Sequence, residues 1–306
     1  MSQLPNLKHL QYLLALHEHQ HFHRAAEACF VSQSTLSSAI LKLEEQLECQ
    51  LVERDNKSFI FTAHGETLVE MARNILLATG EFMSYAKFQG DATKGELRLG
   101  SIPTIAPYLM PDLVQRCQES LPDLSLYLKE DTTENLMGAL ANGEIDVALL
   151  ALPVASHNFK SRVVGRDAFY MAASEKLVDL YHQDHSYARL PEQSIFLLSN
   201  EHCLTEHAVS ACQLADPSRI NHFSASSITT LVQMTAYHHG FTYLPAMAVN
   251  KGVGETEGLV VERMPESMYR EIGLLWRPTS HRQVTYLKIA SLIETLMKDN
   301  NSLNNN

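Results

Sequence analysis

The sequence has few cysteines and no long hydrophobic run. Its five cysteines among 306 residues are an odd number, which does not suit a scaffold of paired disulfides. The apolar segments near the N-terminus are short and are interrupted by His and Glu, so we expect no signal peptide and no membrane-spanning helix. These absences predict a cytoplasmic protein, in which a disulfide would form only transiently and for a function.

Basic residues are also scarce. The chain has 24 Lys and Arg against 35 Asp and Glu, for a net charge of −11. Residues 1–66 contain five Lys and Arg against eight Asp and Glu, so this segment is not a basic patch. Bulk charge therefore disfavours nucleic acid as a partner, and a DNA-binding function must be argued from motif geometry. Gly-rich phosphate loops of the Walker or Rossmann type are missing as well.

Residues 4–55 have the pattern of three helices. Leucines recur at helical spacing in residues 7–16, a second short helix is expected over 21–30, and Ser32 suits the N-cap of a third. The polar face at the start of the third helix carries Gln33, Ser34, Thr35, Ser37, Ser38 and Lys42. This arrangement favours a helix-turn-helix, which presents such hydrogen-bonding groups to base edges and phosphates.

An ordinary three-helix packing unit with a solvated polar face is the alternative. The next residues, 51–62, predict a short β-ribbon, which favours a DNA-binding head instead. The residues that we expect at the DNA are Ser32, Gln33, Ser34, Thr35 and Ser38 from the helix, with Arg54 and Lys57 from the ribbon. Because each head is poor in basic residues, affinity should depend on several heads binding together.

Residues 66–89 predict a longer helix, bracketed by Gly65 and Gly90. Its apolar positions step by four and three residues, which is the spacing of a coiled-coil seam. A core helix of a single chain is the alternative, but a long seam between two domains favours dimerisation. The expected dimerisation residues are Leu68, Ala72, Ile75, Thr79 and Phe82.

From Gly95 onward strands alternate with helices. The progression predicts βαβ units with a parallel sheet, and a second unit begins near Arg166. A late strand at 270–278 is expected to return to the first unit before a final helix. Two α/β lobes joined by two crossovers suggest a cleft in which a small ligand could bind.

The segment Asn200 to Cys212, NEHCLTEHAVSAC, contains two cysteines and two histidines. Cys203 and Cys212 lie nine positions apart, a rise of about 13.5 Å on a helix, whereas a disulfide needs its Cα atoms within about 7 Å. The pair therefore cannot join while the segment stays helical. A zinc site from His202, Cys203, His207 and Cys212 lacks the tight spacing of structural zinc sites. A disulfide formed by refolding, a metal site and two buried thiols all remain open at this point.

Other candidates for metal or thiol chemistry have simpler interpretations. Histidines alternate from His17 to His23, where we favour structural or phosphate-facing roles over metal binding. Cys29, Cys49 and Cys117 lie on apolar helical faces or in turns, where packing thiols are expected.

The N-terminal part resembles the DNA-binding domain of LysR-type transcriptional regulators. The resemblance is carried by the paired alanines, the V-S-Q-x-x-L-S run, the L-E-x-x-L that closes the helix, Arg54, and T-x-x-G at Thr62 to Gly65. It implies an α/β fold with a winged helix-turn-helix domain, a linker helix, and a two-lobed, periplasmic-binding-protein-like regulatory domain. The implied boundaries are 1–65, 66–91 and 92–298, followed by a polar tail at 299–306.

Four segments are similar to the OxyR family of peroxide sensors within that group: EHQHFHRAA, GSIPTIAPYLMP, EHCLTEHAVSAC and REIGLLWRP. The resemblance implies that Cys203 is oxidised by peroxide and that Cys212 resolves it into a reversible disulfide. It implies a peroxide pocket formed by Thr104, Thr133, His202 and Arg270.

The chain departs from that family beside the reactive cysteine. Glu201 stands where the family commonly has Gly, and Thr205 and Glu206 replace an Arg-Asp pair. We expect these three residues to tune peroxide sensitivity. In the DNA-binding helix Ser34 replaces a frequent Pro, which bears on operator preference.

The resemblance also implies the partners. These are double-stranded promoter DNA, hydrogen peroxide, a homodimer or homotetramer, RNA polymerase, and glutaredoxin or thioredoxin systems that reset the thiols. We expect a nucleoid-associated bacterial transcription factor and not an enzyme, with no cofactor, metal or membrane. A LysR-type regulator that binds a small metabolite in the cleft, with Cys203 idle, is the alternative, and a freestanding peroxidase is a third hypothesis.

Overall fold

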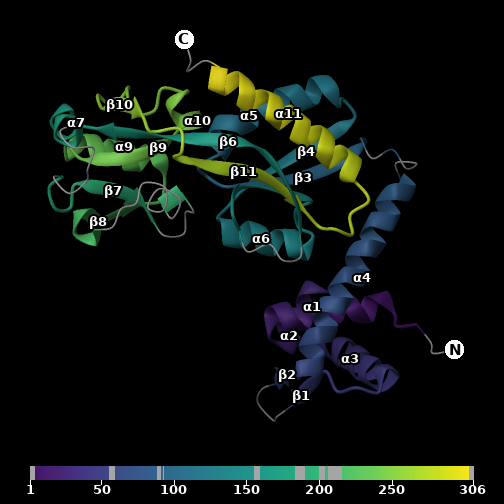
Figure 1. Cartoon of the computed structure of the whole chain (residues 1–306). Helices are drawn as coiled ribbons and strands as arrows, with labels where there is room; N and C mark the ends of the chain where they lie inside the picture. Colours follow the sequence, from purple (N-terminus) through teal and green to yellow (C-terminus); the bar gives the residue numbers. More distant parts are fainter. Residues whose placement is uncertain are drawn as a thin grey trace. The chain divides into compact units, whose positions relative to one another are not determined.

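The computed structural model describes residues 4–54, 59–87, 91, 93–154, 159–182, 190–199, 204–205 and 216–302. The chain divides into two compact units, Met1–Gly90 and Asp91–Asn306, which we describe separately (Figure 1). None of the described helices has the length and hydrophobicity that a bilayer crossing needs.

The first unit is a helical head with a small β-ribbon. Its elements are α1 (Leu7–His19), α2 (Phe22–Ala28), α3 (Gln33–Leu47), β1 (Val52–Arg54), β2 (Phe59–Phe61) and α4 (Ala63–Lys87). Helices α1 and α3 form because their leucines share one face, and Leu13, Leu16 and Leu36 are fully buried in a common core. Ala25 and Ala26 are buried where α2 crosses its neighbours, as small residues at a close crossing should be.

Helix α4 begins at Ala63, three residues before the expected start at residue 66. Gly65 therefore lies in its first turn. Thr62 caps the helix, because its hydroxyl accepts a hydrogen bond from the Gly65 backbone N–H at 2.9 Å. Glycine is required here for space and not as a helix boundary. A Cβ at this position would lie 2.2 Å from the Leu51 carbonyl oxygen.

The second unit is built on a mixed β-sheet. Its described strands are β3 (Gly95–Ser101), β4 (Leu124–Glu130), β5 (Val147–Leu152), β6 (Lys160–Ala173), β7 (Ile195–Leu198), β8 (Ile220–Ala225), β9 (Phe241–Pro245), β10 (Val260–Arg263) and β11 (Tyr269–Trp276). Their order is β4-β3-β5-β11-β6-β9-β7-β8, with β10 also paired to β6. Parallel pairing holds for β3 with β4 and β5 and for β7 with β8 and β9. The expectation of a parallel sheet was wrong for β11 and β6, which run antiparallel to their neighbours.

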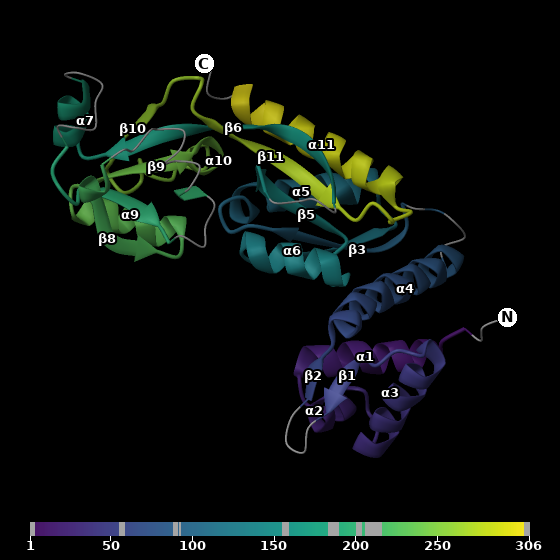
Figure 2. The same cartoon turned by 60° about the horizontal axis from the view of Figure 1, so that its bottom comes forward.

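Helices cover both faces of the sheet. They are α5 (Ala106–Ser120), α6 (Thr133–Asn142), α7 (Glu175–His182), α9 (Ile228–Tyr237), α10 (Ala246–Val249) and α11 (Gln283–Ser302), with a 3-10 turn, η2, at Pro217–Arg219. The first lobe is the part of the sheet built on β3, β4, β5 and β11. There α5 and α11 lie on one face and α6 on the other (Figures 1 and 2). The pattern of the sequence indicated α5, α6, α9 and α11, but it missed β10 and the short helices α7 and α10.

Strand β6 belongs to both lobes of this unit. Its first half pairs with β11 in the first lobe, and its last residues, Phe169 to Ala173, pair with β9 in the second. The chain returns through β10 and β11, as the sequence indicated for the late strand. A residue near the middle of β6 therefore lies at the junction of the two lobes.

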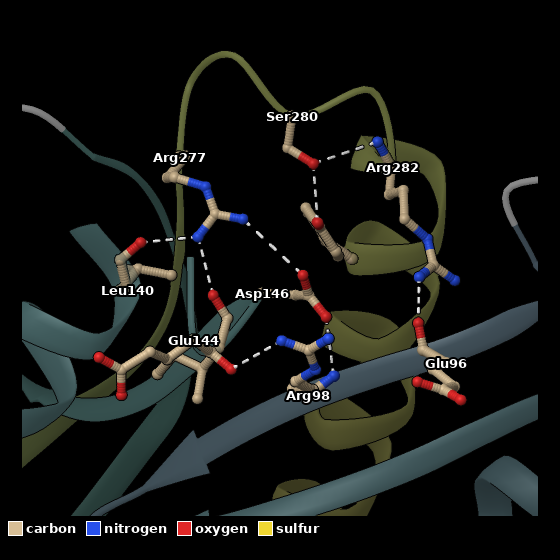
Figure 3. A network of polar contacts seen from close by, with 10 residues as sticks. Glu96, Arg98, Leu140, Glu144, Asp146, Arg277, Ser280 and Arg282 are labelled. Carbon is tan, nitrogen blue, oxygen red and sulfur yellow. Dashed lines mark hydrogen bonds and ion pairs between the residues drawn. The ribbon is translucent and has the colours of Figure 1, made fainter. Parts of the chain in front are cut away.

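A polar network lies just beyond the C-terminal end of β11 (Figure 3). The buried Arg277 guanidinium donates to the carbonyl oxygens of Leu140 and Ile145 at 2.6 and 2.8 Å and lies 3.7 Å from Asp146. Arg282 donates to the carbonyl oxygens of Lys94 and Glu96, where β3 begins. The network ties the start of the sheet to the end of α6 and the start of α11.

Helix α11 continues to Ser302, beyond Lys298, which we expected to be the last residue before the polar tail. Asp299 lies 3.5 Å from Arg116 on α5, and this ion pair helps to hold the last turns. The helix expected over 202–215 lies almost entirely outside the described residues.

Candidate functional site

Two of the predicted pocket residues meet in a buried site between the lobes. Thr104 lies in the loop between β3 and α5, and Arg270 is the second residue of β11. The Arg270 Nη1 donates to the Thr104 hydroxyl at 2.8 Å, and its Nη2 donates to the Thr104 carbonyl at 2.9 Å. Thr104 and Arg270 are each only 2% exposed. Two residues that are 166 positions apart in the sequence are thus brought into direct contact.

Asp167 on β6 completes this cluster, and the sequence reasoning missed it. One of its oxygens accepts from Arg270 Nε and Nη2 at 3.0 and 2.9 Å, and the other accepts from the Met247 backbone N–H at 3.1 Å. Burial raises the pKa of Asp167, and the guanidinium of Arg270 works in the opposite direction. A carboxylate that opens the apolar run DAFYMAA was the available signal, because a charge in a buried strand needs a partner.

Thr133 and Thr205 have defined positions near the ends of strands. Thr133 is the half-buried first residue of α6 and follows β4, whose neighbour β3 leads to Thr104, so both threonines lie at one edge of the sheet. Thr205 is buried, and its hydroxyl donates to the Leu198 carbonyl at 2.8 Å, which ties it to the end of β7. Glu201, His202, Cys203, Glu206 and Cys212 lie outside the described residues.

The predicted DNA-binding edge of α3 is exposed and internally hydrogen-bonded. Ser32 caps the helix by accepting from the Thr35 N–H at 3.1 Å, and its hydroxyl also lies 2.8 Å from that of Ser34. Gln33 and Ser38 are exposed beside them. These side chains form one hydrogen-bonding surface at the start of the helix, which is the part of a recognition helix that approaches bases.

Arg54 is held against the head by three contacts. Its guanidinium donates to the Ser37 hydroxyl at 3.3 Å, lies 3.7 Å from Glu44, and stacks over Phe22 at 5.3 Å from the ring centre. The side chain is still 33% exposed, so a phosphate contact stays a prediction. Lys57 lies outside the described residues.

The exposed seam of α4 differs from the predicted one. Ala72 was wrong as a dimerisation residue, because it is only 2% exposed in the core of its own head, and Leu68 packs against the same core. Thr79 is half-buried, whereas Ile75 and Phe82 are exposed. The exposed apolar face is formed by Met71, Ile75, Ala78, Phe82 and Tyr85, spaced by four and three residues along the helix.

The remaining thiols are half-buried or buried, and His17 and His21 have polar partners in the head. Cys29 and Cys49 are half-buried and Cys117 is buried. Burial raises the pKa of Cys117 to about 11, so this thiol is protonated and unreactive at neutral pH. His17 bonds to Glu66 at 2.9 Å, and His21 caps α2. The described residues hold no cluster of His, Cys, Asp or Glu suited to a metal ion, whereas the ligands considered between His202 and Cys212 lie outside them.

Both units of the chain match domain models of one protein family. Residues 7–66 match the bacterial regulatory helix-turn-helix protein, lysR family, and residues 90–298 match the LysR substrate binding domain. The chain belongs to the LysR family of DNA-binding transcriptional regulators.

Within that family the chain is an OxyR-like regulator. The DNA-binding transcriptional dual regulator OxyR of Escherichia coli strain K12 is 35% identical over 95% of this chain and 96% of its own. The relative of the same identity and coverage in E. coli O157:H7 is named hydrogen peroxide-inducible genes activator. A full-length OxyR of Pseudomonas aeruginosa with one cysteine replaced by aspartate is 28% identical with a TM-score of 0.71, covering 95% of both chains.

The OxyR2 regulatory domain of Vibrio vulnificus is also similar. A structure with a cysteine-to-serine replacement is 49% identical with a TM-score of 0.64, and it covers 67% of this chain and 97% of that one. Another structure of that domain has glycine in place of a glutamate two positions before the same cysteine. Glu201 stands two positions before Cys203 here.

Proposed function

We propose that this chain senses hydrogen peroxide through Cys203 and converts its oxidation into promoter activation of antioxidant genes. The observation that carries the proposal is the buried contact between Arg270 and Thr104, two of the residues that the family resemblance assigns to the peroxide pocket. Both are buried and joined by hydrogen bonds, which fit a site that stabilises a developing charge. The peroxide-linked names of similar proteins support the same chemistry.

The proposed reaction has two steps. The Cys203 thiolate attacks one peroxide oxygen, the O–O bond breaks, and hydroxide leaves, which yields a sulfenic acid. The Cys212 thiol then attacks the sulfenic sulfur and water leaves, so that the two cysteines are oxidised to a disulfide and peroxide is reduced.

Four side chains form the proposed pocket: Thr104, Thr133, His202 and Arg270. Arg270 supplies positive charge, and Thr104 accepts its hydrogen bond while keeping a hydroxyl hydrogen to donate toward an oxygen ligand. Such donors stabilise the negative charge that develops on the leaving oxygen.

Disulfide formation is the proposed switch. The nine-residue separation of Cys203 and Cys212 spans about 13.5 Å on a helix, so closing the bond requires the intervening segment to refold. A covalent event then becomes a change between two conformations, which we propose alters oligomer packing and contact with RNA polymerase at the promoter. Glutaredoxin or thioredoxin systems would return two electrons and reset the thiols.

The test is mass spectrometry of the full-length chain after a brief, low dose of peroxide. We expect an intramolecular Cys203–Cys212 disulfide, with Cys117 unmodified because its pKa is about 11. The Cys212→Ser variant should accumulate Cys203 sulfenate and lose most peroxide-dependent promoter activation.

Three results would contradict the proposal in different ways. Full activation by Cys212→Ser would reject the disulfide switch. An unmodified Cys203 would favour a regulator that answers to a small metabolite in the cleft. Continuous, enzyme-like peroxide consumption with a thiol reductant would favour a peroxidase.

A further inference from the structure

Asp167 and Arg270 are direct cross-strand partners. They face each other in the antiparallel register of β6 and β11, and their side chains are 2% and 0% exposed. Both Arg270 Nε and Nη2 donate to the same carboxylate oxygen of Asp167. On the other side of the guanidinium, Nη1 and Nη2 donate to the hydroxyl and the carbonyl oxygen of Thr104. The arginine is thus oriented from two sides, by one lobe-spanning strand and by one loop of the first lobe.

The second oxygen of Asp167 has its own partner in the second lobe. It accepts from the backbone N–H of Met247 at 3.1 Å, in the first turn of α10. A further ion pair joins α5 to a residue just after α10, since Lys251 lies 3.1 Å from Asp112. Asp167 therefore contacts both the first turn of α10 and the guanidinium of Arg270.

We propose that Asp167 is a positioning residue for Arg270, which directs the guanidinium toward Thr104 and reduces the positive charge that the pocket offers to a thiolate. The proposal rests on the proposed function, in which Arg270 serves Cys203. A buried guanidinium without a counter-ion would be costly and could adopt other rotamers. The ion pair with Asp167 fixes the orientation of the Arg270 guanidinium and offsets its positive charge.

The charge argument predicts a direction. Replacing Asp167 by Asn keeps an oxygen for Arg270 and removes the negative charge, so a nearby thiolate becomes more stable. Tyr108 on α5 also interacts electrostatically with Arg270, and Glu130 and Glu257 act in turn on Tyr108. These stay unchanged in the variant, so a shift in the thiol can be assigned to Asp167.

The experiment measures the rate at which iodoacetamide alkylates Cys203 in the reduced, full-length chain as a function of pH. In Asp167→Asn the pH midpoint should fall by about one unit, because removal of one nearby charge moves a thiol by roughly that amount. The matched control is Glu271→Gln on β11, whose carboxylate is 38% exposed and pairs with Arg166 at 3.5 Å. Its midpoint should equal that of the wild type.

Coincident profiles for Asp167→Asn and the wild type would overturn the inference. If Asp167→Asn does not fold, Asp167→Glu decides, because it keeps the charge and displaces the guanidinium. It should lower the rate of sulfenate formation by peroxide about tenfold, and a wild-type rate would reject the positioning role. A wild-type Cys203 that is alkylated but never oxidised by peroxide would reject the proposed function instead, while the alkylation profiles still test Asp167.

Discussion

Glu201 is one of the residues at which this chain departs from the family of peroxide sensors that it resembles. A carboxylate two positions before the reactive cysteine opposes formation of a thiolate, because two negative charges repel each other. The Vibrio vulnificus OxyR2 domain has a glutamate with the same spacing before a cysteine. A role for Glu201 in tuning sensitivity stays a prediction.

We expect Glu201→Gly to form Cys203 sulfenate faster than the wild type, by roughly threefold to tenfold at neutral pH, because the repelling charge is removed. The measurement is stopped-flow oxidation with a sulfenate probe. Glu201→Gln separates charge from backbone freedom, since it removes the charge and keeps the side-chain length. Rates identical to the wild type in both variants would show that Glu201 has no part in sensitivity.

Helix α4 contains two glycines with opposite requirements. Gly65 packs against the Leu51 carbonyl, whereas a Cβ at Gly80 would have nothing within 4 Å. The first glycine is therefore needed for packing, and the second only costs helix propensity.

We expect Gly65→Ala to lower the free energy of unfolding of the head by about 2 kcal/mol, because the added methyl overlaps backbone atoms. Gly80→Ala, the matched control in the same helix, should raise it by about 0.5–1 kcal/mol. Hydrogen exchange of peptides from α1 and α4 in the full-length chain measures both. A tolerated Gly65→Ala would contradict the tight crossing at Leu51.

At the scale of the whole molecule, the exposed apolar face of α4 is the candidate dimer contact. Phe82 and Tyr85 are 71% and 64% exposed within the single chain, and Met71 and Ile75 continue the face at heptad-like spacing. Exposed apolar side chains at this spacing favour a second helix. A homodimer would also bring together two heads that are individually poor in basic residues.

We expect Phe82→Glu to raise the dissociation constant of the dimer at least about tenfold, since a charge would be buried in the seam. Met83→Glu is the control, because Met83 is 63% exposed and lies about 100° further round the helix. Sedimentation equilibrium compares the two. Equal weakening by both variants, or by neither, would argue for a different dimer face.

Local patterns alone predicted much of this chain. The leucine spacing of α1 and α3, the Ser32 cap and the alternation of strands and helices each depend on a few neighbouring residues, so they could be predicted directly. Short elements such as α10 could not, because four residues carry too little periodicity. Ala72 was misassigned because a spacing of four and three residues does not say whether the stripe faces its own head or a partner.

The sequence by itself determined the helix-turn-helix head, the family, and the candidate roles of Thr104, Arg270 and the cysteine pair. Only the tertiary structure decided that Arg270 lies between Thr104 and Asp167, which are 166 and 103 positions away. Caps and helical faces are set by contacts within a few residues, so the sequence displays them. The partner of a buried charge is set by strand order and register, which are settled only when β6 and β11 pair.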